Sequence, residues 1–163
     1  MNVNGIIAEY NPFHNGHQFQ LAESRRLTDA DYTIIVMSGN FVQRGAPALT
    51  DKRLRTEMAL RCGADLVLEL PVLYATASSE TFAAGAVALL DQLGVVTHLA
   101  FGSECGEVAA LSRIAAFLAE EPKAYQLELK RFLKQGLSYP DARNRALSLC
   151  AVSEENRENA APG

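Results

Sequence analysis

Residues 5–17, GIIAEYNPFHNGH, decide how the rest of the sequence is interpreted. Their first part, Gly5 to Ala8, is an unbroken apolar run, which is typical of a short strand covered on both faces. The Asn11-Pro12 pair ends this run, and a helical pattern of apolar residues follows. The two histidines, His14 and His17, are therefore expected in the turn between a strand and a helix.

This turn has the composition of an anion-binding site. In parallel α/β sheets, ligands bind beyond the carboxyl ends of the strands, where the N-terminus of a helix attracts negative charge. Asn15 is expected to cap the helix, and Gly16 lets a phosphate or a flat group approach the backbone. His14 and His17 can donate hydrogen bonds to phosphate oxygens, more strongly as imidazolium ions. The turn is therefore predicted to bind a phosphate-bearing ligand.

Two other interpretations of the histidine pair remain open. Histidines in a loop are often solvated surface residues, and a pair of them can also bind zinc. The only other histidine is His98, and no cysteine lies near the pair in the sequence, so we assign no metal ligand. The preceding strand, Pro12, Gly16 and the following helix favour the anion site.

The pattern H-x-G-H after a first strand resembles the signature of the HIGH-motif nucleotidyltransferase superfamily, whose members attack the α-phosphate of ATP and release pyrophosphate. The longer stretch EYNPFHNGH is similar to one family within it, the bacterial tRNA(Met) cytidine acetate ligases. Further blocks resemble the same family: SGNFVQRG at 38–45, DKR at 51–53, FGSE at 101–104 and LSYPDAR at 137–143. The resemblance implies that ATP activates acetate as acetyl-AMP, and that the acetyl group passes to N4 of the wobble cytidine of elongator tRNA(Met).

Catalytic roles are expected for His14, His17 and Arg44, which would orient ATP and stabilise charge on its phosphates. Arg44 stands beside Gly45 in a loop that could close over a phosphate, although it could also be a plain surface residue. Glu9 could orient a loop N–H, bind Mg²⁺ with the phosphates, or be structural. The residues expected to contact ATP are Ile7, Ala8, Glu9, Tyr10, Asn11, Pro12, Phe13, His14, Asn15, Gly16, His17, Gln20 and Gly102.

The rest of the chain predicts an α/β fold, a Rossmann-like open parallel sheet with flanking helices followed by a short helical segment. Strands are expected at 5–8, 31–37, 66–70 and 95–101, and helices at 18–27, 51–62, 79–93, 108–118, 125–135 and 139–149. Thr50 is expected to cap the second helix. We expect a nucleotide-binding domain at 1–106, a helical extension at 107–150 and a disordered tail at 151–163.

Composition limits the class of protein. The 163 residues carry a net charge of −4 and no apolar run long enough for a membrane span, and the N-terminus lacks a basic segment. We therefore expect a cytoplasmic protein, with its three cysteines buried or half-buried. Residues 123–145 hold six basic side chains and two acidic ones, a local charge of +4. This segment could be a solvated helical face or a contact for the phosphates of tRNA.

Two alternative functions stay open: an adenylyltransferase acting on another small acceptor, and a catalytically silent ATP- or RNA-binding module. Members of the family that the motifs resemble are usually more than twice as long, and a further block with an asparagine and an arginine that touch the nucleotide follows their LSYP helix. We therefore expect this chain to be a truncated or short form.

Overall fold

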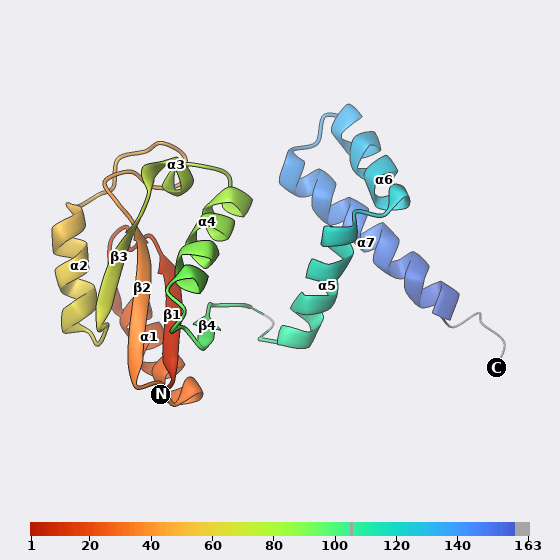
Figure 1. Cartoon of the computed structure of the whole chain (residues 1–163). Helices are drawn as coiled ribbons and strands as arrows, with labels where there is room; N and C mark the ends of the chain where they lie inside the picture. The colour runs from red at the N-terminus through yellow and green to blue at the C-terminus, as the bar shows by residue number, and fades with distance from the viewer. Residues whose placement is uncertain (105, 159–163) are drawn as a thin grey trace. The chain divides into compact units, whose positions relative to one another are not determined.

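The computed structural model describes residues 1–104 and 106–158, with side chains described as far as Cys150. The chain forms two compact units, Met1–Glu104 and Cys105–Gly163 (Figure 1). The first unit is a sheet with helices on both faces, and the second consists of helices. No helix in the described part of the chain combines the length and the apolar character needed to cross a bilayer.

The first unit contains the predicted open parallel sheet. Its strands are β1 (Val3–Ala8), β2 (Tyr32–Ser38), β3 (Leu66–Leu70) and β4 (His98–Ala100), in the order β3-β2-β1-β4. The central strand β1 pairs with β2 and β4, so that Ile6 lies beside Ile35 and Ala100. Because the chain moves outward from β1 to β3 and then returns beside β1, the order reverses between β1 and β4. In open α/β sheets, ligands bind at this reversal point.

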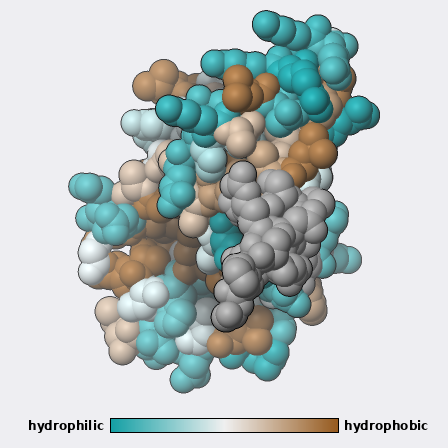
Figure 2. Space-filling view, turned by 90° about the vertical axis from the view of Figure 1, so that its right-hand side faces the viewer, coloured by the Kyte–Doolittle hydropathy of each residue, from teal (hydrophilic) through white to brown (hydrophobic). Residues whose placement is uncertain are grey.

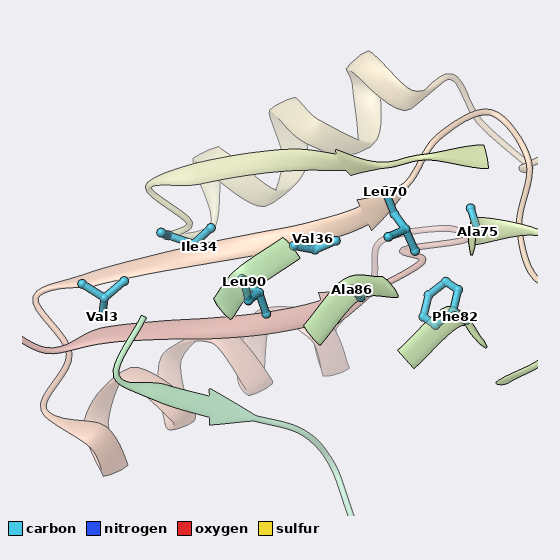
Figure 3. Close-up of a cluster of buried hydrophobic side chains, with 8 residues drawn as sticks. All are labelled: Val3, Ile34, Val36, Leu70, Ala75, Phe82, Ala86 and Leu90. Atoms are coloured by element: carbon cyan, nitrogen blue, oxygen red, sulfur yellow. The ribbon is translucent and has the colours of Figure 1, made fainter. Parts of the chain in front are cut away.

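Helices cover both faces of the sheet. On one face lie α1 (Asn15–Thr28) and α2 (Lys52–Arg61), packed through a buried cluster that includes Ile6, Leu21, Ile35 and Ala59. On the other lie α3 (Val72–Ala75) and α4 (Ser79–Gln92). Figure 3 shows their cluster, in which α4 directs Phe82, Ala86 and Leu90 towards Val3, Ile34, Val36 and Leu70.

Gly5 shows how closely α4 approaches β1. A Cβ atom at this position would lie 2.9 Å from Leu90 Cδ1 and 3.1 Å from Val96 Cγ1. Real Cβ atoms essentially never come closer than 3.0 Å to such neighbours, so only glycine fits here without a movement of the Leu90 side chain. Gly5, the first residue of the apolar run that predicted the strand, therefore leaves space for the side chains of Leu90 and Val96.

The second unit contains α5 (Val108–Glu120), α6 (Lys123–Lys134) and α7 (Tyr139–Glu158). Its core consists of Tyr125, Phe132, Ala142, Ala146 and Cys150. The α7 helix continues to Glu158, into the segment for which disorder was predicted from Ala151 onward. The rest of the predicted tail, 159–163, lies outside the described residues.

Some predicted bounds and caps also differ. Helix α1 begins at Asn15 instead of Gln18, and β4 covers only His98–Ala100 instead of 95–101. Asp51, not Thr50, caps α2, since its carboxylate accepts a hydrogen bond from the Arg53 N–H at 2.8 Å. Cys62 is half-buried and Cys150 is buried, as predicted, while Cys105 lies outside the described residues.

Candidate functional site

A hollow of about 430 Å³ opens where β1 ends and α1 begins. This volume lies within the range of small-molecule sites, and the place is the carboxyl edge of the sheet beside its reversal point. Many of the predicted ATP contacts line it, namely Ile7, Ala8, Glu9, Tyr10, Asn11, Pro12, His14, His17 and Gln20. The other predicted contacts, Phe13, Asn15, Gly16 and Gly102, do not line it, and neither does Arg44.

The two histidines form the cap of α1. His14 is the N-cap residue, and its Nδ1 accepts a hydrogen bond from the Gly16 N–H at 3.1 Å. In return, Nδ1 of His17 accepts one from the His14 N–H at 3.3 Å, which completes a capping box. The prediction that Asn15 caps the helix is therefore wrong, because the His14 ring takes that role and Asn15 is the first helical residue.

This cap determines where the two imidazoles carry their protons. Because Nδ1 accepts in both rings, each neutral imidazole bears its proton on Nε2, which is then available to donate to a ligand. The rings are stacked with their centroids 3.7 Å apart. Partial burial, and to a smaller extent the His14 charge, lowers the pKa of His17, which favours the neutral ring. A proton on either Nδ1 would break the cap.

Gly16 lies beside the ring of His14. A Cβ at this position would lie 3.0 Å from Cε1 and 3.1 Å from Nδ1 of His14. The absence of a side chain at Gly16 therefore makes room for the capping imidazole.

Two aromatic side chains, Tyr10 and Phe13, pack against the ring of His17. Tyr10 is only 1% exposed, and its ring centroid lies 4.8 Å from those of both Phe13 and His17. Burial, and to a smaller extent the neighbouring Cys62, raises the pKa of Tyr10, so the phenol stays neutral. Phe13, which was predicted to contact ATP, packs against the rings of Tyr10 and His17.

The loop that carries Arg44 is tied to the hollow by two side chains that line it. Oε1 of Glu9 accepts a hydrogen bond from the Gln43 N–H at 2.7 Å, and Oδ1 of Asn11 accepts one from the Leu49 N–H at 2.6 Å. The loop is also closed by a hydrogen bond from the Val42 N–H to the Ala46 carbonyl. It is thus an anchored loop rather than a loose one.

The Arg44 side chain is exposed, and among the described residues its guanidinium has no hydrogen bond or ion pair, whereas its backbone N–H donates to the Val42 carbonyl at 2.6 Å. Its backbone φ is 144°, in a region that favours glycine. Non-glycine residues in such conformations cluster at ligand clamps and active sites. Arg44 is therefore an unpaired guanidinium held at a strained position near the hollow.

The remaining features of the site are Gly102, which is a predicted ATP contact, and the groups that could hold a metal ion. Gly102 follows β4 by two residues, on the same sheet edge as the hollow, and open space surrounds the position of a Cβ there. Among the side chains that the structure describes, no three His, Cys, Asp or Glu residues converge to hold a metal ion. Glu9 is the one carboxylate that lines the hollow.

Sequence reasoning missed Arg55, which is fully buried in α2. Its guanidinium donates hydrogen bonds to the carbonyl oxygens of Glu9, Ser38, Gly39 and Thr50. An arginine in a polar helix is normally expected at the surface. The DKR block lies in the same helix, but nothing in its pattern indicates that the next arginine points inward.

Comparisons with known proteins agree with this geometry. The sequence model of the family described as HIGH Nucleotidyl Transferase matches residues 1–161. The tRNA(Met) cytidine acetate ligase of Thermoanaerobacter sp. (strain X514) is 57% identical over 147 residues, and that of Clostridium perfringens (strain ATCC 13124) is 54% identical over 147 residues. Each alignment covers 90% of this chain and 37% of the relative, so the chain spans a little over a third of the length of these relatives.

A solved structure shows the same likeness. The crystal structure of Thermotoga maritima TmcAL bound with alpha-thio ATP matches with a TM-score of 0.88 and 52% identity, over 95% of this chain and 37% of that chain. The resemblance that the sequence motifs indicated is thus confirmed over nearly the whole chain, and the chain belongs to the HIGH nucleotidyl transferase family.

Proposed function

We propose that this chain binds ATP in the hollow between β1 and α1 and transfers its adenylyl group to acetate. The observation that carries the proposal is the capping box, which leaves the Nε2 donors of His14 and His17 free at the N-terminus of a helix. The relative from Thermotoga maritima, whose structure holds alpha-thio ATP, supports the choice of ligand.

The proposed first step needs no proton transfer. An acetate oxygen attacks the α-phosphorus of ATP, the bond from that phosphorus to the bridging oxygen breaks, and pyrophosphate leaves with the electron pair. Acetate is already ionised near pH 7, so no general base is required. Catalysis then consists of positioning and charge stabilisation by His14, His17 and the N–H groups at the start of α1. Gln20 lines the same hollow and can donate through its amide.

Arg44 would stabilise the departing pyrophosphate. Its guanidinium is unpaired, and its loop is already tied to the hollow through Glu9. The loop would therefore bring Arg44 to a phosphate by a small adjustment rather than by folding from a disordered state. Gly102 would admit the ribose or the adenine from the side of β4.

Mg²⁺ fits the hollow as a companion of the phosphates. Magnesium usually keeps several waters and binds through one or two carboxylates together with substrate phosphates. Glu9 is the single carboxylate available, and one of its oxygens already accepts from Gln43. Its other oxygen could hold the ion, which when bound would neutralise charge on the pyrophosphate.

We further propose that acetyl-AMP serves the acetylation of N4 of the wobble cytidine in elongator tRNA(Met). The relatives named tRNA(Met) cytidine acetate ligase support this assignment. Basic side chains on the second unit would contact RNA phosphates, and Lys123, Lys130, Arg131, Lys134 and Arg145 are exposed there. Figure 2 shows hydrophilic side chains gathered at the top of the view, where the C-terminal end of α6 lies.

The test is exchange of labelled pyrophosphate into ATP, measured with and without acetate. Exchange that depends on acetate is expected, and His17→Ala should abolish it, because alanine has no side-chain donor to replace the imidazole. Exchange that ignores acetate and responds to a mononucleotide acceptor would reject acetate as the substrate. Absence of ATP binding in calorimetry would reject the proposal as a whole.

A further inference from the structure

We propose that Arg55 is a positioning residue for the nucleotide site, which it serves by holding the β1–α1 turn against the β2–α2 connection. This inference rests on the proposed binding of ATP in the hollow. Arg55 belongs to α2 and does not line the hollow, so its effect would be transmitted through the backbone that it binds.

The contacts of Arg55 join segments that are far apart in the sequence. Nη1 donates to the carbonyls of Glu9 at 2.7 Å and Ser38 at 3.0 Å, Nη2 donates to Gly39, and Nε donates to Thr50 at 3.1 Å. Glu9 opens the turn after β1, whereas the other three acceptors delimit the connection from β2 to α2. A single planar side chain therefore links both segments at the carboxyl edge of the sheet.

Only arginine suits this arrangement. The guanidinium carries five N–H donors in a rigid plane, whereas a lysine ammonium is a compact charge at the end of a flexible stem. The side chain is fully buried, and its removal would take this donor away from all four carbonyls at once. Burial lowers the pKa of Arg55, while Asp51, Glu9 and Glu69 raise it, and the group stays charged.

Glu9 shows how the effect reaches the ligand. Arg55 holds its backbone carbonyl, and the Gln43 N–H holds its carboxylate. The peptide unit between Glu9 and Tyr10 is thus fixed directly at the wall of the hollow, between the end of β1 and the histidine pair. Release of this carbonyl would let the turn shift relative to the loop that carries Arg44.

Ser38 and Gly39 extend the same argument to a neighbouring space. They line a second hollow of about 350 Å³, on the α2 side of the sheet, together with Lys52 and Glu69. Lys52 and Glu69 form an ion pair of 2.6 Å there. Arg55 therefore binds backbone from the walls of both hollows and fixes the spacing between them.

Arg25 provides a matched control at the opposite edge of the sheet. Its guanidinium donates to the carbonyls of Ala30, Asp31 and Gly63 and to the carboxylate of Asp65. These acceptors precede or begin β2 and β3, so they lie at the amino edge, away from the hollow. Loss of Arg25 removes a similar number of hydrogen bonds from the same unit without touching the nucleotide site.

The experiment compares Arg55→Met, Arg55→Lys and Arg25→Met by calorimetric titration with a non-hydrolysable ATP analogue, with thermal unfolding measured in parallel. We expect Arg55→Met to weaken ATP binding by about tenfold or more, since a shifted turn would misplace its donors, and one hydrogen bond to a charged phosphate contributes about that much to the affinity. Arg55→Lys keeps the positive charge but lacks the planar set of N–H donors. Compared with Arg55→Met, it should therefore restore the melting temperature more fully than the affinity for ATP. Arg25→Met should lower the melting temperature and leave affinity within about twofold.

Unchanged affinity in a folded Arg55 variant would overturn the assignment, as would an equal loss of affinity in Arg25→Met. If Arg55→Met does not fold, Arg55→Lys is judged by the same criteria. Failure of both to fold would also overturn it, because Arg55 would then serve the whole unit. Failure of the unaltered chain to bind the analogue would instead reject the proposed function, and this inference with it.

Discussion

The substitution Gly16→Ala separates the role of the His14 ring from the stability of α1. The new Cβ would lie 3.0 Å from Cε1 and 3.1 Å from Nδ1 of His14, so the ring must move, and we expect its hydrogen bond to the Gly16 N–H to be lost. Loss of an N-cap bond costs about 1 kcal/mol. Alanine in place of glycine in a helix gains up to about 1 kcal/mol. The two terms nearly cancel, so the free energy of unfolding should change by less than about 1 kcal/mol.

The affinity for ATP should decrease in Gly16→Ala, because the gain in helix propensity does not offset the loss of a donor to the ligand. A hydrogen bond to a charged group contributes about 1.5–3 kcal/mol, so displacement of the His14 donor should weaken ATP binding by about 10- to 100-fold. Calorimetric titration with a non-hydrolysable analogue measures the affinity, and thermal unfolding measures stability. The melting temperature of a unit of this size shifts by roughly 4–8 °C per kcal/mol, so a failure of the two stability terms to cancel would be visible as a shift of the melting temperature.

A double-mutant cycle tests whether Gly16 acts through His14. In the background of His14→Ala, the Gly16→Ala change should cause no further loss of affinity and should raise stability, since no ring remains to be displaced. The reasoning is refuted if Gly16→Ala binds ATP as well as the unaltered chain. It is equally refuted if the two losses of affinity simply add.

Three further predictions follow from the same contacts. Burial lowers the pKa of His17 in the folded chain, so between this pKa and the ordinary value of about 6.5 the unfolded chain binds more protons than the folded one. The free energy of unfolding should therefore decrease as the pH falls through this interval. In His17→Gln, the melting temperature should change less over the same pH interval. Glu9→Ala should speed amide hydrogen exchange at Gln43 by about tenfold or more, whereas Glu9→Gln, which keeps an acceptor, should preserve protection; equal protection in both would contradict the anchoring role. Gly5→Ala should destabilise the first unit by about 1–3 kcal/mol in urea titration, through overpacking against Leu90 and Val96, while a folded sample keeps its ATP affinity.

The strands could be predicted because their apolar runs reflect burial between helix layers. The run over Gly5 to Ala8 fixed the place of the turn, and with it most of the residues that line the hollow. The strand at Leu66 to Leu70 also has a mostly apolar sequence but is less buried: Leu66 is 42% exposed, because β3 is an edge strand. The order of the strands in the sheet depends on contacts between distant segments, so it cannot be predicted from a local pattern of residues.

The cap of α1 and the role of Arg55 could not be predicted for a related reason. N-cap preferences favour Asn over His, so Asn15 was the better choice from composition alone. His14 caps because His17 stands three residues later and completes a reciprocal pair, with imidazoles in place of the usual Ser or Thr and Glu or Gln. Arg55 is buried because carbonyls of the β1–α1 turn and of the β2–α2 connection converge on it, and the direction of a backbone carbonyl cannot be inferred from residue types.

The place of β1 between two hydrogen-bonded neighbours has a consequence for control of the site. Central ladders are usually among the last parts of a domain to open, since their amides exchange only when the whole unit unfolds. The floor of the hollow is the end of this strand, where Ile7 and Ala8 continue the ladder with β2 beyond the last pair with β4. The floor should therefore open less readily than the rim, and a regulator of the proposed activity would act most easily on the loop around Arg44 or on the histidine cap.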